Sequence, residues 1–490
     1  MADRLAALDA SFLYAESPTL PMHVGTVAVF TAGGDGFGYE DLVALVRSRL
    51  GRVPRFRQKV RPVPAGLAGP VWVDDADFDV TYHVRRSALP RPGDDEQLCE
   101  LAARLMSRPL DRARPLWELY LVEGLLGDRF ALISKTHLAM VDGVRAVDLA
   151  EVLLDPRPGA GDDAGTSPPW LPEPEPSDGE LVRDAMADVV RRPTRALATV
   201  RAASGDLATT AGRVLTTAFS AAGTLAAALR PGPSTLTVST SAHRRFAVTD
   251  IDLDGFRTIR SRLGGTVNDA ILTTLTLALR SWLLARGEAV TATSTLRALV
   301  PVSVHDPGTG ADDQSPDTSP GRTHARAHVR AHSVDLPIGE PNAVVCLQQV
   351  SYGMRAHTDD EHGVDARSLV GLAGFAPSTL HSLGTRVAAG LSRRLYHTVV
   401  TNVPGPQRPL YANDALLVAA YPVVPLVPGQ ALSIGLTSYA GRVYFGFTGD
   451  RGSLTDVADL VPAVLDSRAH LLAAATATET TDTGTTETVA

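Results

Sequence analysis

A histidine, an aspartate and a glycine lie close together in a segment that can place a base beside a tight turn. Residues 134–148 read SKTHLAMVDGVRAVD, with His137 five residues before Asp142 and Gly143. An imidazole with an unperturbed pKa of about 6.5 can act as a general base near neutral pH. A carboxylate nearby can orient the ring or fix the loop, and glycine allows the turn. The segment therefore indicates acid–base chemistry, although a histidine beside an aspartate is more often a surface or packing residue.

The elements around this segment are those of an α/β protein. Apolar and β-branched residues predict two strands joined by a turn at residues 124–128, the second of which leads into His137. Residues 71–84 read as extended and residues 144–154 as a helix start. Further strands and helices are predicted at residues 23–30, 41–50, 94–106 (with Asp94 or Asp95 as N-cap), 116–123, 130–136, 246–253, 268–285, 296–304, 396–403, 432–436 and 442–447.

Changes in composition divide the chain. Residues 1–153 read as one α/β unit, and residues 245–474 as a second. Between them, residues 154–244 begin with a Pro- and Gly-rich linker and continue as amphipathic helices. In that connector, residues 181–230 hold seven Arg against three Asp, which fits either packing across both units or contact with anionic lipid. Residues 475–490 are rich in Thr and Glu and are expected to be disordered.

Bulk composition excludes several classes of function. The chain has 490 residues and a net charge of −8, with 46 basic residues of which only Lys59 and Lys135 are lysines. This balance does not indicate nucleic-acid binding. Two distant cysteines, Cys99 and Cys346, make neither a zinc ribbon nor a disulfide framework, so a reduced cytoplasmic setting is expected. No apolar run approaches the ~18 residues of a spanning helix, so any membrane contact is expected to be peripheral.

Several short motifs, in order, resemble the bacterial wax ester synthase/diacylglycerol acyltransferase family, which shares the chloramphenicol acetyltransferase-like fold. The segment at 137–143 resembles its His-His-x-x-x-Asp-Gly motif. The other similar stretches are LDASFLYAESPTLPMHVG (8–25), RPLWELYLVEGL (114–125), VNDAIL (267–272), LRALVPVSV (296–304), VDLPIGEP (334–341), TNVPGP (401–406) and SIGLTSYAGRVYFGFTGD (433–450). Together they span about residues 5–472. Their number and order make the resemblance far more specific than any single motif does.

The resemblance implies two such halves, each a mixed sheet with flanking helices, joined by a helical connector. It implies transfer of a fatty acyl group from acyl-CoA to diacylglycerol or a long-chain alcohol, with no metal or other cofactor, at a membrane or lipid-droplet surface. It assigns a role in catalysis to His137 and Asp142. Supporting positions are Gly143, Pro115, Leu116, Trp117, Asn268, Asp269 and Asn402.

The chain departs from the family pattern at the catalytic base. The family uses the second histidine of the motif, and that position is Leu138 here, which has no titratable atom. A strand before the VDLP motif is also altered, because residues 326–330 read RAHVR where the family has a Gly-Asn-x-Val-Ser type of sequence.

Three hypotheses follow. In one, His137 substitutes as the base, although neighbouring strand residues point to opposite faces, so this requires a bulge or the end of the strand. In the second, the chain is a weak or inactive paralogue that binds acyl-CoA or lipid. In the third, which the Pro-Leu-Trp and Asn-Asp motifs disfavour, it uses acceptors of the peptide-synthetase condensation kind.

Overall fold

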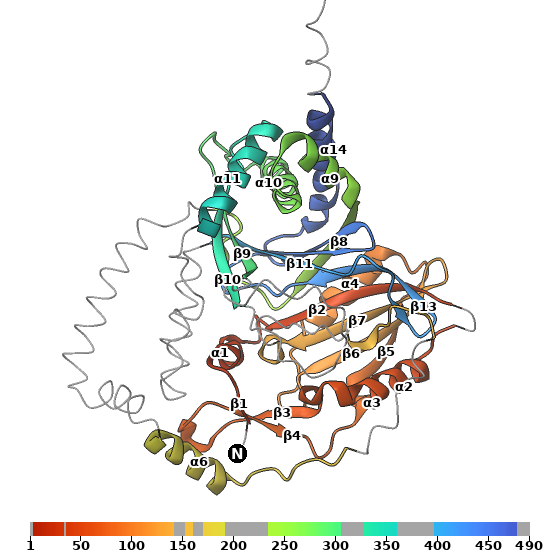
Figure 1. The fold of residues 1–490 in the computed structure, drawn as a ribbon, viewed down its shortest axis with the longest axis vertical. Helices are drawn as coiled ribbons and strands as arrows, with labels where there is room; N and C mark the ends of the chain where they lie inside the picture. Colours follow the sequence, from red (N-terminus) through yellow and green to blue (C-terminus); the bar gives the residue numbers. More distant parts are fainter. Residues whose placement is uncertain are drawn as a thin grey trace, which may run out of the picture.

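A computed structural model describes residues 3–33, 36–141, 152–159, 170–191, 234–304, 328–359 and 396–477. In these residues two mixed sheets lie one above the other, with a small third sheet at the far end of the first (Figure 1). Both larger sheets combine parallel and antiparallel pairs. The predicted fold class, α/β with two mixed sheets and flanking helices, is confirmed.

The first sheet carries the segment with His137. Its strand order is β12-β13-β2-β7-β6-β5. β7 is the predicted strand before the candidate motif, and it pairs with β2 so that His23 stands opposite His137. The bounds are β2 His23–Thr31, β5 Val84–Ala88, β6 Trp117–Leu125, β7 Arg129–His137, β12 Tyr411–Ala412 and β13 Ala415–Val423.

Two strands of this first sheet come from late in the sequence. β13 pairs antiparallel with β2, and β12 with β13, so residues 411–423 complete a sheet whose other strands lie within residues 23–137. Sequence composition places these residues in the second unit, because their continuous apolar run does not indicate which strand they pair with. The division of the chain at residues 153 and 245 stays a prediction. β12 and β13 lie after residue 245 in sequence but belong to the first sheet.

The second sheet has the order β10-β9-β11-β14-β15-β8. β14 and β15, the strands predicted at residues 432–436 and 442–447, form a hairpin through Ala440 and Gly441, both of which have positive φ. The bounds are β8 Arg244–Asp252, β9 Leu296–Val304, β10 His328–Leu336, β11 Thr398–Pro404, β14 Leu432–Tyr439 and β15 Arg442–Asp450. One face is covered by α9 Leu253–Leu263, α10 Val267–Ala285, α11 Ala343–Asp359 and α14 Leu460–Ala477 (Figure 1).

Helices on both faces of the first sheet give it two apolar cores. α2 (Tyr39–Arg49) buries Leu42 and Val46 on one face, and α4 (Asp95–Met106) buries Leu98 and Leu105 on the other. α4 also contacts Phe246 of β8, so it packs between the first sheet and the edge of the second. Asp94 is the N-cap of α4, as predicted, and its carboxylate accepts from Gln97 N–H.

The small sheet has the order β1-β4-β3, from Asp3–Arg4, Val71–Asp74 and Gln58–Arg61. The prediction of an extended segment over residues 71–84 is therefore only partly right, because β4 ends at Asp74 and a short helix, α3 (Val80–His83), follows. Asp79 caps α3 through its side chain, which lets the chain leave the extended conformation. α6 (Asp178–Arg191) packs on this sheet through Leu181 and Ala185.

Candidate functional site

The candidate motif begins where β7 ends. His137 is the last residue of the strand, and Leu138–Met140 form one turn of 3₁₀ helix, η4. The backbone is held on both sides, because His137 N–H donates to Leu116 O (3.0 Å) and Leu138 N–H donates to Met22 O (2.9 Å). Helix α1 (Ala7–Ala15) packs against η4. The predicted partners Asp142 and Gly143 lie outside the described residues, as does most of the helix expected at 144–154.

The ring of His137 is fully buried and both of its nitrogens are directed at protein groups. Its Nδ1 accepts a hydrogen bond from Ala139 N–H at 2.9 Å. An imidazole nitrogen that accepts in this way carries no proton, so the neutral ring holds its proton on Nε2. That Nε2 lies 3.7 Å from the carboxylate oxygen Oε1 of Glu16. Neither nitrogen is therefore placed to take a proton from a substrate hydroxyl.

Glu16 is the centre of a buried polar cluster. Its side chain is 7% exposed and its Oε1 lies 3.1 Å from His23 Nε2. Its other oxygen, Oε2, accepts from Arg112 Nη2 at 2.6 Å and from Arg112 Nε at 3.1 Å. We call Glu16, His23, His137 and Arg112 the Glu16 cluster. It ties the end of α1 to the first residue of β2 and the last residue of β7.

The cluster perturbs the titration of two of its members. Burial would raise the pKa of Glu16, but the close contacts with His137 and His23 and the hydrogen bonds from Arg112 outweigh it and hold the pKa well below its ordinary range. Burial lowers the pKa of His23 to about 4, against the opposing contact with Glu16. His23 is therefore neutral near pH 7, whereas Glu16 is ionised.

Leu138 lies in a different environment. Its side chain is half-buried and packs against an apolar group formed by Leu20, Met22 and Leu426. Leu426 follows β13 from late in the sequence, so both parts of the chain contribute to this group. We call these four residues the Leu138 cluster. None of its side chains can accept a proton, which matters because Leu138 occupies the family's base position.

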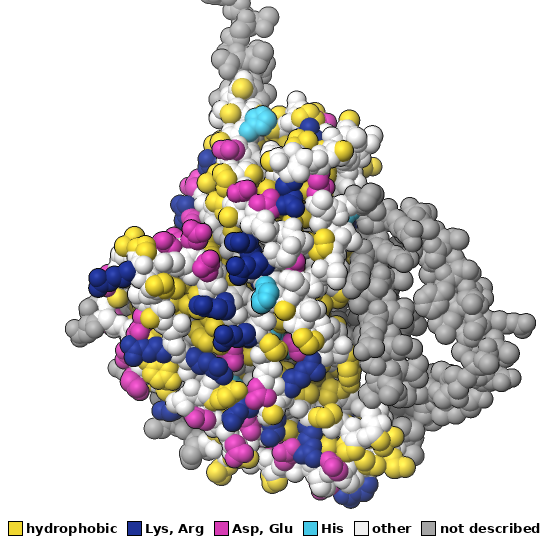
Figure 2. All heavy atoms as spheres, turned by 180° about the vertical axis from the view of Figure 1, so that it is seen from behind, with side chains coloured by type: hydrophobic (Ala, Val, Ile, Leu, Met, Phe, Trp, Pro, Cys, Tyr) yellow, Lys and Arg dark blue, Asp and Glu magenta, His cyan; other side chains and the backbone are white. Residues whose placement is uncertain are grey.

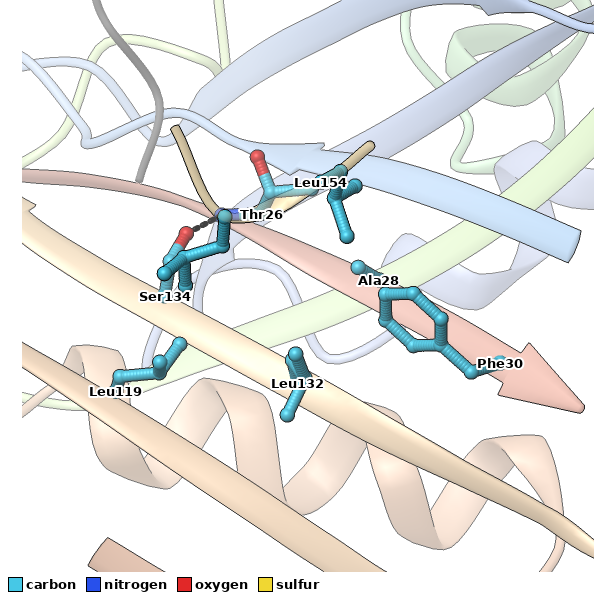
Figure 3. A pocket seen from close by; sticks show the side chains of 8 residues that line it. Thr26, Ala28, Phe30, Leu119, Leu132, Ser134 and Leu154 are labelled. Atoms are coloured by element: carbon cyan, nitrogen blue, oxygen red, sulfur yellow. Dashed lines mark hydrogen bonds between the residues drawn. The ribbon is translucent and has the colours of Figure 1, made fainter. Parts of the chain in front are cut away.

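A small hollow lies on the opposite face of β2 and β7 from His137. Strand alternation puts His137, Lys135 and Ile133 on the face of α4, and Ser134 and Leu132 on the other. In the close view the hollow lies under β2, and Ser134 Oγ accepts from Thr26 N–H at 2.9 Å (Figure 3). Its lining residues are Thr26, Ala28, Phe30, Leu119, Leu132, Ser134, Leu153 and Leu154. His137 does not face it.

The Pro-Leu-Trp residues lie in the core beneath the site. Pro115, Leu116 and Trp117 are buried, and Trp117 Nε1 donates to Phe56 O at 2.8 Å. Because Leu116 O accepts a hydrogen bond from His137 N–H, the Pro-Leu-Trp tripeptide also positions the end of β7. It is part of the scaffold of the site and offers no group for proton transfer.

Asn268, Asp269 and Asn402 come together in the second sheet and its helices. Asn402 Nδ2, on β11, donates to Asn268 Oδ1 at 2.7 Å. Asp269 is in the capping box of α10, accepting from Thr266 N–H, and it also accepts from Ser351 Oγ at 2.9 Å. In the described residues, no direct contact joins these three side chains to His137 or Leu138.

Sequence reasoning did not single out Glu16, His23 or Arg112. Glu16 and His23 both lie inside the family's opening motif, so a carboxylate and a histidine seven residues apart were a signal. No feature of the sequence pointed to Arg112, because it is one of many arginines. Lys135 was also missed, although it is one of only two lysines. It is buried, its Nζ donates to Arg108 O at 2.6 Å, and burial lowers its pKa.

The described residues offer no group of three His, Cys, Asp or Glu arranged to hold a metal ion. Of the helices in the described ranges, none combines the length and apolar character that crossing a bilayer requires.

Comparisons with known proteins agree with the motifs. The model of the wax ester synthase/diacylglycerol acyltransferase catalytic domain matches residues 5–271, and that of the WS/DGAT C-terminal domain matches residues 328–470. Two relatives in Mycobacterium tuberculosis H37Rv are described as probable diacylglycerol O-acyltransferases. One, tgs1, is 30% identical over 485 residues, covering 96% of each chain. The other, tgs3, is 45% identical over 267 residues, covering 54% of this chain and 97% of the relative.

Solved structures extend the likeness to three dimensions. The wax ester synthase/diacylglycerol acyltransferase from Marinobacter aquaeolei VT8 aligns with a TM-score of 0.66 and 26% identity, over 96% of this chain and 100% of that one. A starter condensation domain of rhizomide synthetase RzmA shares the fold, with a TM-score of 0.54 and 14% identity over 97% and 94% of the two chains. With both domain models matched and a relative aligned along its whole length, the chain belongs to the wax ester synthase/diacylglycerol acyltransferase family of acyltransferases.

Proposed function

We propose that this protein moves a fatty acyl group from acyl-CoA to diacylglycerol or a long-chain alcohol, at a rate lowered by the lack of a general base. Family membership supports the reaction type. The single observation that supports the lowered rate is the Leu138 cluster, because an apolar group fills the position from which the family takes the acceptor's proton. A lipid acceptor implies that the protein works at a membrane or lipid-droplet surface from the cytoplasm.

The reaction needs few groups from the protein. The acceptor oxygen attacks the thioester carbonyl, the carbon–sulfur bond breaks, and the CoA thiolate leaves. The hydroxyl proton ends on that thiolate, so the products are an ester and free CoA. A positioned base typically contributes ~10²–10⁴-fold to such a step. Without one, holding the two substrates together is the remaining source of acceleration.

The geometry of His137 disfavours it as a substitute base. Its Nδ1 lone pair is used by Ala139 N–H, its Nε2 faces Glu16, and its ring is buried on the side away from the hollow. The same observations favour a second candidate function, in which the chain binds acyl-CoA or lipid without turnover. We expect Asp142 and Gly143 to shape the loop after η4 in either case.

Restoring the base is the decisive experiment. In an assay of triacylglycerol formed from labelled acyl-CoA and diacylglycerol, Leu138→His is expected to raise kcat by about 100-fold or more. Leu138→Asn is the matched control, because it adds polarity at the same position without a base, and its rate should stay at the wild-type level.

The outcomes separate the candidates. A wild-type rate equal to the blank, together with acyl-CoA binding by calorimetry, would establish the binding function. A rate that falls in a folded His137→Ala variant would show instead that His137 is the base. An unchanged rate in Leu138→His would mean that the missing histidine does not limit transfer, and the proposal would be wrong.

A further inference from the structure

Basic side chains gather where the end of α4 meets the start of β8. Ser107 follows α4, and its Oγ accepts from Arg244 N–H at 3.1 Å. On the other side, Arg451 N–H donates to His243 O at 3.0 Å. These two bonds bring together the exposed residues Arg104, Arg108, His243 and Arg451, which we call the α4 basic patch. In the view from behind, Lys and Arg side chains gather along the middle of the molecule (Figure 2).

The arginine side chains of the patch are not neutralised by carboxylates. Arg85, Arg86 and Arg112 nearby each have a carboxylate partner. In the described part of the chain, the side chains of Arg104, Arg108 and Arg451 have no hydrogen-bond or ion-pair partner. Beneath them Arg244 is buried, with Asp450 3.7 Å away. A surface with several unpaired cations is suited to a multiply charged anion.

The patch is connected to Leu138 by two short routes. Arg108 O accepts from Lys135 Nζ, and Lys135 is three residues, about 10 Å of extended strand, from Leu138. Arg244 Nη2 donates to Thr19 O at 2.7 Å, and the next residue, Leu20, belongs to the Leu138 cluster. The patch therefore lies only a few residues from the Leu138 cluster along both routes, a separation that an elongated ligand can span.

We propose that the α4 basic patch binds the phosphates of the CoA moiety, so that the pantetheine arm carries the thioester toward Leu138. The inference rests on the proposed function and adds to it by assigning the donor's phosphate site. CoA carries a pyrophosphate and a separate phosphate monoester, and Arg forms paired hydrogen bonds with such oxygens. The His243 ring adds a hydrogen-bond donor at the edge of the patch.

Helix-end electrostatics and membrane binding account for the patch less well than CoA does. Basic residues favour the C-terminal end of a helix, and this accounts for Arg104 and Arg108 at the end of α4 but not for His243, which precedes β8, or Arg451, which follows β15. A surface that binds an anionic membrane usually has apolar side chains beside its charges, because their burial in the bilayer strengthens binding. None of the exposed large hydrophobic residues in the described ranges lies within residues 104–114, 239–245 or 449–453.

Neutralising the patch tests the proposal with free CoA as the probe. In calorimetric titrations at low salt, the triple variant Arg104→Gln, Arg108→Gln, Arg451→Gln should raise the Kd for CoA at least tenfold, about tenfold being expected for each lost phosphate contact. The matched control is Arg47→Gln, Arg52→Gln, Arg260→Gln, which neutralises three exposed arginines away from the patch and should stay within twofold. Arg451→Gln alone, a loop change, provides the measurement if the triple variant does not fold.

Octanoyl-pantetheine, which lacks the phosphates, distinguishes this inference from the proposed function. The patch variant should bind it as the wild type does. An unchanged Kd for CoA in the patch variant, or an equal rise in the control, would overturn the inference while leaving the proposed function intact. If the patch variant no longer sediments with phosphatidylglycerol vesicles while its Kd for CoA is unchanged, the patch binds lipid. That result would also overturn the inference. Wild-type protein that binds neither CoA nor octanoyl-pantetheine would refute both proposals.

Discussion

His137 and Leu138 are adjacent in sequence but belong to two different kinds of environment. His137 joins the Glu16 cluster, which is polar and, apart from the half-exposed Arg112, buried among protein groups. Leu138 joins an apolar group drawn from three segments of the chain. In this chain the first position of the motif therefore has structural contacts, whereas the second has only apolar neighbours.

The largest effect on stability is expected from Glu16→Ala. This change leaves the rings of His23 and His137 and the guanidinium of Arg112 without their shared carboxylate. Breaking a buried pair by removing one partner costs about 3–5 kcal/mol. Urea unfolding should show a loss in this range. Glu123→Ala, which removes an exposed pair with Arg86, is the control and should leave the free energy of unfolding nearly unchanged. Equal losses in the two variants would mean that the Glu16 cluster does not stabilise the fold.

Acid is expected to weaken the same cluster. Because burial lowers the folded-state pKa of His23 from 6.5 to about 4, the unfolded chain binds more protons between these values. Stability should therefore be full above about pH 6.5 and fall by about 3 kcal/mol as the pH drops toward 4. The lowered pKa of Glu16 adds a further loss below its ordinary range near 4.3.

The His23→Gln variant isolates the His23 contribution. Unfolding free energies measured from pH 7.5 to pH 4 should fall less steeply in this variant than in the wild type. His83, whose pKa burial also lowers, contributes to the slope of both proteins and cancels in the difference. Parallel pH profiles would show that His23 titrates normally in the folded protein.

The smallest losses of stability are expected from substitutions at His137 and Leu138, which can be compared directly. His137→Ala removes a fully buried ring and its bond from Ala139, and we expect a loss of about 2–3 kcal/mol. Leu138→Ala truncates a half-buried side chain, which should cost about 1 kcal/mol. Thermal unfolding of both variants under identical conditions makes the comparison. A larger loss for Leu138→Ala would reverse the roles assigned to the two positions.

The sequence predicted most of the strands and helices because their apolar periodicity is local. Strand β9 and the α4 helix with its Asp94 cap agree with the prediction within a residue or two. The short helix α3 was missed, since a capping side chain within an otherwise extended pattern leaves little signal. The placement of β13 beside β2 could not be predicted, because strand pairing between residues hundreds of positions apart leaves no local trace.

By itself, the sequence determined the family, the order of its motifs and the absence of a titratable group at Leu138. It left open whether His137 could act in its place. Only the tertiary structure decided which groups surround each residue, since Glu16 reaches His137, and Arg112 reaches Glu16, from other elements. The physical reason is that burial and hydrogen-bond partners set the tautomer and accessibility of an imidazole, and both are properties of packing across distant segments. The basic patch likewise exists only because α4, β8 and the chain after β15 meet in space.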